Sequence, residues 1–310
     1  MKMNLSNIKK AKKFLDKGEC IAIPTETVYG LAGNAYSNTA CKKIYKLKNR
    51  PRNNPLIVHY YSIKKLKEDC DFNNIFLKFY ERFCPGPITF ILNLNKNSKI
   101  SKILTNQKNS VAIRFPRHPI TRCLLKKISF PLAAPSANIS SKVSAVTSND
   151  VREDFGKKIK FILEGGKSSI GVESTIIDLR KKPKILRLGS IEISEIKKIL
   201  KKKINIEKNP LKVTSPGQLK IHYSPGIPLR MNVKKVKNKE AYLLINRKKK
   251  NKSNFYFLSK NGNLKEAAKN LYSVLRKIKK DNYKSIAVEK IPNKGIGETI
   301  NDRLMRASRF

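Results

Sequence analysis

The sequence lacks several features that would place the protein in a common class at once. No run of apolar residues approaches the roughly eighteen needed to span a bilayer, so we expect no membrane partner. Residues 1–15 contain neither an uninterrupted apolar stretch nor a small-residue cleavage site, so they do not predict a secretion signal. The five cysteines include no C-x-x-C pair, which argues against a disulfide framework and a zinc site. These absences predict a protein of the reducing cytoplasm.

Common catalytic and nucleotide-binding motifs are also missing. The three histidines lie far apart, so we predict no metal site, and there is no G-x-S-x-G motif of a serine hydrolase. Residues 166–168 resemble the end of a P-loop, but the first required glycine is Phe161. Residues 295–297 resemble a dinucleotide fingerprint, but its third glycine is Ile300. Neither segment therefore predicts phosphate binding.

Acidic residues are few. The chain has 22 Asp and Glu against 68 Lys and Arg, which gives a formal net charge of +46. Such a charge favours an anionic partner, either RNA or nucleotide phosphates. A genome rich in A and T would also enrich lysine, and the lysines are scattered without interleaved aromatic residues. A non-catalytic basic RNA-binding protein therefore remains an alternative to an enzyme.

The apolar pattern of the 310 residues predicts a layered α/β protein. Up to about residue 205, helical and strand periodicities alternate, and a mixed sheet is expected. The expected helices are 5–17, 37–47, 73–83, 119–127, 148–155 and 192–202. The expected strands are 20–23, 56–59, 88–94, 110–115, 130–134, 159–163, 174–179 and 184–188. Together they predict a first domain over residues 1–205.

Prolines and glycines accumulate between about 205 and 230, where the periodicity lapses. This composition predicts a stiffened linker over residues 206–230. The remaining residues, 231–310, resume an α/β pattern and predict a small second domain. Its expected elements are strands 241–245, 255–258 and 285–291 and helices 264–280 and 298–307.

Several polar loops follow apolar strands, where ligands collect in α/β sheets. They are rich in cations and hydroxyls and lie at 24–31, 48–59, 110–116, 133–138 and 171–178. Lys48 and Arg50 suit phosphate or carboxylate binding. Arg114 ends an apolar strand, an unfavourable place unless an anion meets it.

These loops offer no obvious general base or nucleophile. A site of cations and hydroxyls suits catalysis by positioning and by stabilisation of phosphate charge. The residues alone thus predict an enzyme that uses ATP or binds a nucleotide.

The same segments resemble the YrdC-like family, and within it the two-domain threonylcarbamoyl-AMP synthases. The resemblance rests on motifs that follow the family order through the whole chain: PTETVYGL (24–31), KNRPRNNPLIVH (48–59), PGPITFIL (85–92), AAPSAN (133–138), GVESTIID (171–178), SPGQLKIHYSP (215–225) and GIGETINDRLMRA (295–307). It implies a YrdC-like twisted mixed sheet flanked by helices, followed by a small Rossmann-like α/β domain with a regulatory or lid-holding role.

The reaction implied by the resemblance joins L-threonine, bicarbonate and ATP into L-threonylcarbamoyl-adenylate and releases pyrophosphate. Such a nucleotidyltransferase supplies the threonylcarbamoyl-adenosine modification of tRNA next to the anticodon. The resemblance implies magnesium with ATP and no tightly bound cofactor. It also implies downstream tRNA threonylcarbamoyl-transferase proteins as partners, and weak RNA binding.

Site residues follow from the resemblance by position in the motifs. The implied threonine site consists of Thr27, His59, Arg114, Ala134 through its backbone, and Ser174. The implied catalytic set is Lys48, Arg50, Ser136 and Asn138. The implied ATP contacts are Arg50, Asn54, Ser110, Ser136, Ser144, Arg187 and Tyr223. In this scheme Arg114 binds the threonine carboxylate, Lys48 and Arg50 hold bicarbonate and phosphate, and Tyr223 closes over the nucleotide.

The sequence departs from the family pattern at a few loop positions. Cys84 replaces a tryptophan, Val143 and Ala145 replace prolines, and Leu188 replaces the proline of a turn. These changes affect the loops around Ser144 and Arg187 but remove no implied ligand. A carbamoyl-adenylate enzyme of hydrogenase maturation shares the fold family, but it would need zinc-finger and acylphosphatase segments that this sequence lacks.

Overall fold

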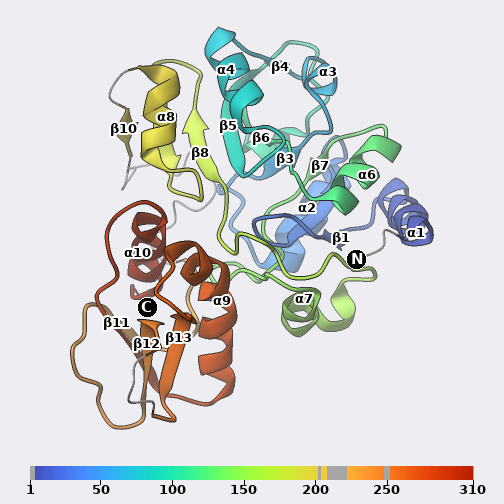
Figure 1. Cartoon of the computed structure of the whole chain (residues 1–310). Coiled ribbons are helices and arrows are strands. Elements are labelled where there is room, and N and C mark those ends of the chain that lie inside the picture. The colour runs from blue at the N-terminus through green and yellow to red at the C-terminus, as the bar shows by residue number, and fades with distance from the viewer. Residues whose placement is uncertain (1–3, 202–203, 208–221, 248–251, 310) are drawn as a thin grey trace.

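The computed structural model describes residues 4–201, 204–207, 222–247 and 252–309. The chain forms two α/β units, each with its own sheet (Figure 1). In Figure 1 the N-terminal unit lies above and to the right, and the C-terminal unit lies below it in orange and red. The layered α/β architecture expected from the sequence is therefore confirmed.

The sheet of the N-terminal unit contains ten strands within the described residues. Their order is β1-β2-β7-β3-β6-β5-β8-β9-β10. The remaining strand, β4, pairs with the last residues of β5. The pairs β3/β6, β5/β8 and β9/β10 are parallel and the others are antiparallel. The strands are β1 Ile21–Ile23, β2 Gly30–Asn34, β3 Ile57–His59, β4 Cys70–Asp71, β5 Ile88–Leu94, β6 Ser110–Arg114, β7 Leu132–Ala133, β8 Thr175–Asp178, β9 Lys184–Arg187 and β10 Asn205–Ile206.

Helices cover this sheet, and polar residues cap several of their first turns. Ser37 caps α2 by accepting from the backbone N–H of Ala40, and Thr147 and Asp150 form a reciprocal capping box on α7. The helices are α1 Leu5–Asp16, α2 Asn38–Lys48, α3 Ile63–Leu66, α4 Asn74–Phe83, α5 Lys102–Thr105, α6 Pro119–Lys127, α7 Ser148–Phe155 and α8 Ile193–Leu200. A short 3-10 turn, Gly156–Lys158, follows α7.

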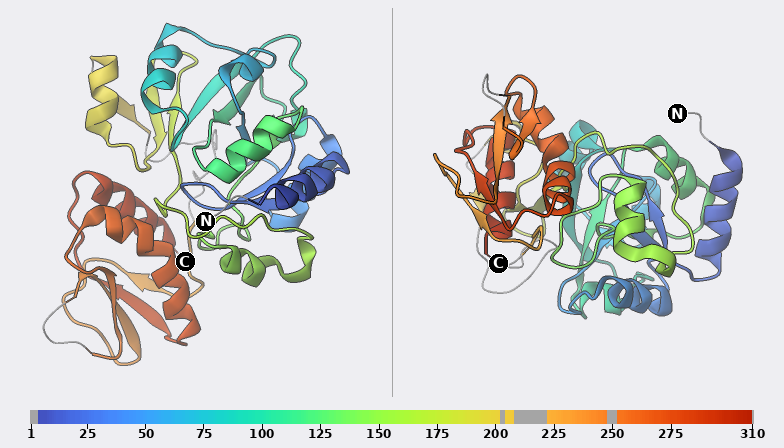
Figure 2. Two further views of the ribbon diagram at one scale, coloured as in Figure 1. Left: turned by 45° about the vertical axis from the view of Figure 1, so that its right-hand side comes forward. Right: turned by 90° about the horizontal axis from the view of Figure 1, so that it is seen from below.

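The C-terminal unit has a parallel sheet of order β11-β14-β12-β13 in the described residues. Its elements are β11 Leu229–Arg230, β12 Glu240–Asn246, β13 Phe255–Ser259, α9 Leu264–Lys280, β14 Ser285–Val288 and α10 Ile296–Ala307. Both helices lie on the side of the sheet that faces the N-terminal unit (Figures 1 and 2). The second core includes valines of the N-terminal unit, namely Val28, Val143, Val146 and Val172. The two units therefore share one apolar interface.

The expected helices all form, with ends shifted by up to a few residues. The strand expected at 159–163 is wrong, because only Ile162 makes an isolated bridge, to Ala22. This segment runs along β1, yet it exchanges only the hydrogen bonds of Phe161 and Leu163 with Ala22. The sequence pattern also missed β2 and the short elements α3, β4 and α5.

Most of the expected linker, 206–230, lies outside the described residues, because the structure does not describe residues 208–221. Its described end contains β11, which pairs with β14 in the second sheet. No described helix has the length and apolarity needed to cross a bilayer.

Candidate functional site

One face of the first sheet carries the polar side chains of the candidate site. Side chains alternate between the two faces of a strand. His59, Arg114 and Thr89 therefore share a face, because His59 pairs with Arg114 across β3/β6 and Arg114 pairs with Thr89 across β5/β6. Next to them on this face lies a small apolar cluster of Ile57, Ile91, Ala112, Ile176 and Leu186. The apolar cluster thus separates these polar groups from Ser110 and Asn93, which pair at the other end of β5 and β6.

A β-bulge brings Arg187 to the same face. Ile176 pairs with Arg187 and Ile177 pairs with Ile185, so Leu186 is an extra residue in β9. If β9 were regular, with Leu186 paired opposite Ile176, alternation would turn Arg187 to the core side together with Ile185. The bulge therefore adds a cation to the site.

These side chains line one cavity, which is partly open to solvent. The cavity wall is built from Thr25, Thr27, Val28, Tyr29, Gly30, Arg50, Ile57, His59, Arg114, Ala134, Pro135, Ser136, Glu173, Ser174, Arg187 and His222. Of the residues expected from the sequence, the wall contains Thr27, Arg50, His59, Arg114, Ala134, Ser136, Ser174 and Arg187.

Lys48 lies directly behind the wall, at the end of α2. Its buried ammonium group donates hydrogen bonds to the carbonyls of Ser136, at 2.5 Å, and Asn138. Burial and the neighbouring charge of Arg50 lower the pKa of Lys48 well below its ordinary value. Lys48 thus fixes the backbone of the 133–138 loop, which forms part of the cavity wall.

Arg50 follows α2 and is held by its own loop. Its guanidinium donates to the backbone carbonyl and side-chain oxygen of Asn54, at 3.0 and 2.5 Å, and to the Pro55 carbonyl at 2.9 Å. Burial lowers the pKa of Arg50 to about 10, which still leaves it a cation at neutral pH. The Nδ2 of Asn54 is buried without a partner. The loop therefore presents a fixed cation and an unused donor.

Arg114 meets an anion supplied by the protein itself. Its Nη2 lies 2.7 Å from a carboxylate oxygen of Glu26, whose other oxygen accepts from the Arg117 backbone N–H. Burial raises the pKa of Glu26, but the charge and hydrogen bond of Arg114 outweigh burial and leave it below its ordinary value. The Nε of Arg114 is buried and has no partner. The strand-end arginine is thus neutralised by Glu26 and keeps a free donor.

His59 lies beside Arg114 as an uncharged ring. Burial and the charge of Arg114 lower its pKa well below the ordinary value, and its Nδ1 has no partner. Farther along the sheet, the hydroxyl of Ser174, just before β8, lies 2.7 Å from that of Thr89 in β5. Arg187 donates to the Ser174 carbonyl and hydroxyl, each at 3.0 Å. This part of the cavity therefore combines neutral hydrogen-bonding groups with two arginines.

The remaining residues expected from the sequence lie in different places. Ser144 is buried and donates to Glu173 at 2.5 Å, and the Nδ2 of Asn138 donates to carbonyls of its own loop. Tyr223 is buried next to the cavity, whereas its neighbour His222 lines it. Ser110 lies at the opposite end of β6, four residues or about 13 Å from Arg114, and accepts from Arg180. The structure therefore does not bring Ser110 to the cavity.

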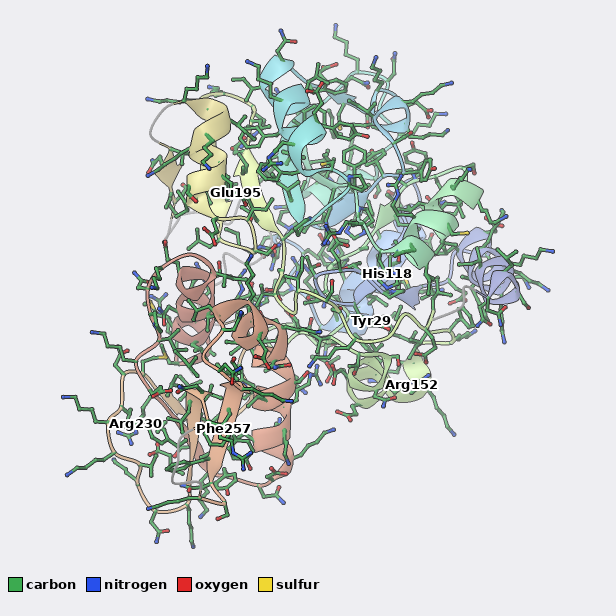
Figure 3. All side chains as sticks on the ribbon, viewed as in Figure 1. Tyr29, His118, Arg152, Glu195, Arg230 and Phe257 are labelled. Atoms are coloured by element: carbon green, nitrogen blue, oxygen red, sulfur yellow. The ribbon has the colours of Figure 1, made fainter. Side chains whose placement is uncertain are left out.

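Sequence reasoning missed several wall residues. Tyr29 belongs to the predicted segment 24–31 but was not assigned a role; it accepts from the backbone N–H of Gly165 and donates to the carbonyl of Gly166. His118 lies near it in Figure 3, outside the cavity wall, with Nε2 3.2 Å from the Gly165 carbonyl. Glu173 and His222 line the cavity without having been singled out. Both stand inside motifs that the resemblance identified, so position in the motif was the available signal.

The donor set favours anionic ligands. The described residues contain no group of three or more His, Cys, Asp or Glu that could hold a metal ion. Three arginines, Arg50, Arg114 and Arg187, line the cavity instead, which suits carboxylate and phosphate.

The chain is similar to known proteins over nearly its whole length. A Sua5/YciO/YrdC family model, described as telomere recombination, matches residues 13–189. A second model, the C-terminal domain of threonylcarbamoyl-AMP synthase, matches residues 191–309. The threonylcarbamoyl-AMP synthase of Pyrococcus abyssi is 35% identical, with 98% of this chain and 94% of that protein covered. The one from Bacillus subtilis is 33% identical with the same coverage.

A solved structure has the same fold throughout. The crystal structure of P. abyssi Sua5 complexed with L-threonine has a TM-score of 0.91 and 32% identity, and the match covers 100% of this chain and 96% of that one. Escherichia coli YciO, at 23% identity and a TM-score of 0.54, shares the fold over 60% of this chain. From the family models, the relatives and this structure together, we conclude that the chain belongs to the threonylcarbamoyl-AMP synthase family, whose members are enzymes of the nucleotidyltransferase type.

Proposed function

We propose that the chain joins L-threonine, bicarbonate and ATP into L-threonylcarbamoyl-adenylate and releases pyrophosphate. The observation that carries the proposal is the single cavity in which a neutralised arginine with a free donor, Arg114, faces two further arginines, Arg50 and Arg187. An amino acid with its carboxylate and a triphosphate both need such cations, and the cavity holds no side chain placed as a covalent nucleophile. The product would serve threonylcarbamoyl modification of tRNA.

The threonine end of the site is assigned to the His59–Arg114 pair. The free Nε of Arg114 would donate to the threonine carboxylate. The uncharged His59, Thr27 and Ser174 offer partners for the amine and hydroxyl, and the backbone of Ala134 completes this end of the wall. The P. abyssi Sua5 structure with L-threonine supports threonine as the amino acid.

The nucleotide end is assigned to Arg50 and Arg187, with Asn54, Ser136, Ser144 and Tyr223 around them. Lys48 and Asn138 shape the 133–138 loop between the two ends. The threonine nitrogen bonds to the bicarbonate carbon with loss of water, which gives a carbamate. A carbamate oxygen then bonds to the α-phosphorus of ATP as the bond to the bridging oxygen breaks and pyrophosphate leaves. Arg50 would hold the anionic reactants in line and offset their charge.

Magnesium would enter with ATP and screen the phosphate charges. Proteins that transfer the threonylcarbamoyl group to tRNA would be the partners that consume the adenylate. Because an acyl-adenylate hydrolyses readily, a closed cavity that excludes water would preserve it.

The test is threonine-dependent pyrophosphate release. Purified protein with ATP, magnesium and bicarbonate should release pyrophosphate severalfold faster when L-threonine is added. Labelled bicarbonate should appear in an adenylate only in the complete mixture. Equal release with and without threonine would reject the proposed reaction.

A second candidate, a non-catalytic RNA-binding protein, is favoured by the net charge of +46. Side chains with nitrogen tips extend outward on several margins of the molecule in Figure 3, rather than on one face. Affinity for RNA that falls steeply between about 50 and 200 mM salt, without any threonine-dependent pyrophosphate release, would favour this candidate.

A further inference from the structure

The cavity wall reaches into the C-terminal unit through one buried carboxylate, Glu173. Its oxygens accept hydrogen bonds from Ser144 (2.5 Å), the Tyr272 hydroxyl (2.8 and 3.1 Å) and Arg303 Nε (2.9 Å). Tyr272 belongs to α9 and Arg303 to α10, whereas Glu173 lines the cavity beside Ser174. Two of its three donor side chains therefore come from the other unit.

The same two side chains hold the residue next to His222. The guanidinium carbon of Arg303 lies 4.8 Å from the ring centroid of Tyr223, and the Tyr272 ring stacks on Tyr223 with centroids 5.8 Å apart. Tyr223 has a φ of +65°, a left-handed backbone conformation that a bulky residue adopts only when its surroundings hold it there. His222 lines the cavity, so the position of this wall segment depends on α9 and α10.

The charges explain what happens when these contacts are lost. Burial raises the pKa of Glu173, but the charges of Arg303 and Arg187 outweigh burial and lower the pKa to about 2, so the carboxylate is ionised. Arg187 is the other arginine whose charge acts on Glu173, and it holds the carbonyl and hydroxyl of Ser174. Without Arg303, the buried carboxylate would draw Arg187 away from Ser174, because a buried unpaired charge is very costly.

We propose that Arg303 and Tyr272 are positioning residues for the reaction assigned above. They hold Glu173, which lines the cavity, and Tyr223, which adjoins His222 of the wall. The wall therefore keeps its shape only while the C-terminal unit is packed against the N-terminal unit. This inference rests on the proposed function, but its contacts can be tested without it.

The chain offers a matched control in a second interdomain ion pair. Arg276 of α9 donates to both oxygens of Asp154, at 3.1 and 2.7 Å, and to the Val143 carbonyl. Neither Arg276 nor Asp154 lines the cavity or contacts Glu173. Glu173→Gln and Asp154→Asn therefore make the same chemical change in two interdomain arginine pairs, of which only one reaches the cavity.

The experiment compares Glu173→Gln and Arg303→Met with Asp154→Asn and Arg276→Met in the full chain. We expect the first pair to lower kcat/KM for ATP at least tenfold, mainly through KM. The second pair should stay within about twofold of the wild type. Both pairs should lower the melting temperature, because each breaks a buried ion pair, so the kinetic constants are compared well below the lowest melting temperature. Arg303→Lys should recover part of the loss, because it restores the charge without the forked geometry. If both pairs of variants lost kcat/KM equally, Arg303 would only hold the two units together, and the proposal would be wrong.

Amide hydrogen exchange provides a readout that does not need turnover. Residues 172–175 and 222–226 should exchange faster in Arg303→Met than in Arg276→Met. Equal exchange in the two variants would overturn the inference even if the wild type proved inactive. Absence of threonine-dependent activity in the wild type would reject the proposed function alone.

Discussion

Lys48 shows how one buried cation can shape a site without lining it. Its ammonium bridges the carbonyls of Ser136 and Asn138, which lie 88 and 90 residues away in sequence. Both carbonyls accept from the same buried nitrogen, and a buried carbonyl that loses its donor is costly. The conformation of the loop 133–138 therefore depends on this side chain.

Lys48→Met should lower the threonine-dependent turnover by about 100-fold or more, in the range seen when one preorganised polar group is removed from a site. The apolar side chain keeps most of the volume but removes the shared donor, which leaves the Ser136 carbonyl with only the Asn138 N–H, so the loop shifts. Steady-state pyrophosphate release measures the effect. Lys43→Met on the same helix loses a partly exposed ion pair with Glu19 and a hydrogen bond to the Gly18 carbonyl, both away from the cavity, and should keep full activity. Equal activity in the two variants would contradict the role of Lys48.

His222 should make the folded protein less stable toward acid. Burial, together with nearby cations, lowers its pKa to about 3, whereas the unfolded chain has the ordinary value near 6.5. Between these values the unfolded state binds the proton and the folded state does not. Stability from this residue is therefore present above about pH 6.5 and is lost as the pH falls toward 3.

The expected size is about 1.4 kcal/mol per pH unit, or about 2 kcal/mol between pH 6.5 and 5. Urea unfolding at pH 7.5 and 5.0 measures this difference. His222→Gln should reduce the acid-induced loss by about that amount, because glutamine does not titrate. Tyr223→Phe, a neighbouring change that removes no group titrating in this range, should leave the difference as in the wild type. An unchanged difference in His222→Gln would contradict a neutral buried ring.

At the scale of elements, Asp69 connects segments that the sheet alone does not hold. One of its oxygens accepts from the hydroxyls of Tyr36 and Tyr60, both at 2.8 Å. The other accepts from the Ser98 hydroxyl and the Lys99 backbone N–H, both at 3.0 Å. These donors precede α2, follow β3 and lie between β5 and α5. A single carboxylate thus joins loops from three parts of the chain.

Asp69→Asn should lower the free energy of unfolding by about 3 kcal/mol, because the amide nitrogen would face donors in a fully buried place. Chemical denaturation followed by circular dichroism measures the change. The exposed Asp71→Asn, two residues away in β4, should cost less than about 0.5 kcal/mol. Kinetic constants should be equal in both variants, because Asp69 lies outside the cavity. A small loss in Asp69→Asn would mean that water replaces the missing acceptor.

Helices and strands could be predicted from the sequence where a helical or strand pattern of apolar residues continues over several residues. Helix 119–127 and strand 88–94 form with the expected bounds. The extra residue Leu186 in β9 could not be foreseen, because a bulge follows from pairing between strands and not from the pattern within one. The strand expected at 159–163 failed for the same reason, since its apolar residues pack without a full ladder.

Which side chains of the site pair with one another was the hardest feature to predict from the sequence. The strand-end Arg114 correctly called for an anion, yet the structure supplies Glu26, 88 residues away. Glu173 and Arg303 are separated by 130 residues and lie in different units. Local pattern carries no information on such pairs. Family motifs identified the segments, while only the folded chain shows which side chains in them meet.

At the scale of the whole molecule, the two units meet over a glycine at which the backbones nearly touch. Gly171 has a φ of +81°, and a Cβ there would lie 2.5 Å from the Cα and the carbonyl oxygen of Lys269 in α9. The Gly171 N–H also donates to the Thr27 carbonyl in the cavity loop. Any side chain at this position would therefore push α9 away from the site.

Gly171→Ala should separate the units, and Gly166→Ala is its matched control. Gly166 has a similar φ of +72°, but a Cβ there would meet nothing within 4 Å. The control should cost about 1 kcal/mol for left-handed backbone strain, or about 2–4 °C in Tm. Gly171→Ala adds a backbone clash, so it should lower Tm at least twice as much and reduce threonine-dependent turnover at least tenfold. Thermal unfolding and pyrophosphate release measure both effects. If the two alanine variants behaved alike in stability and turnover, close docking of α9 would not be required for a working cavity.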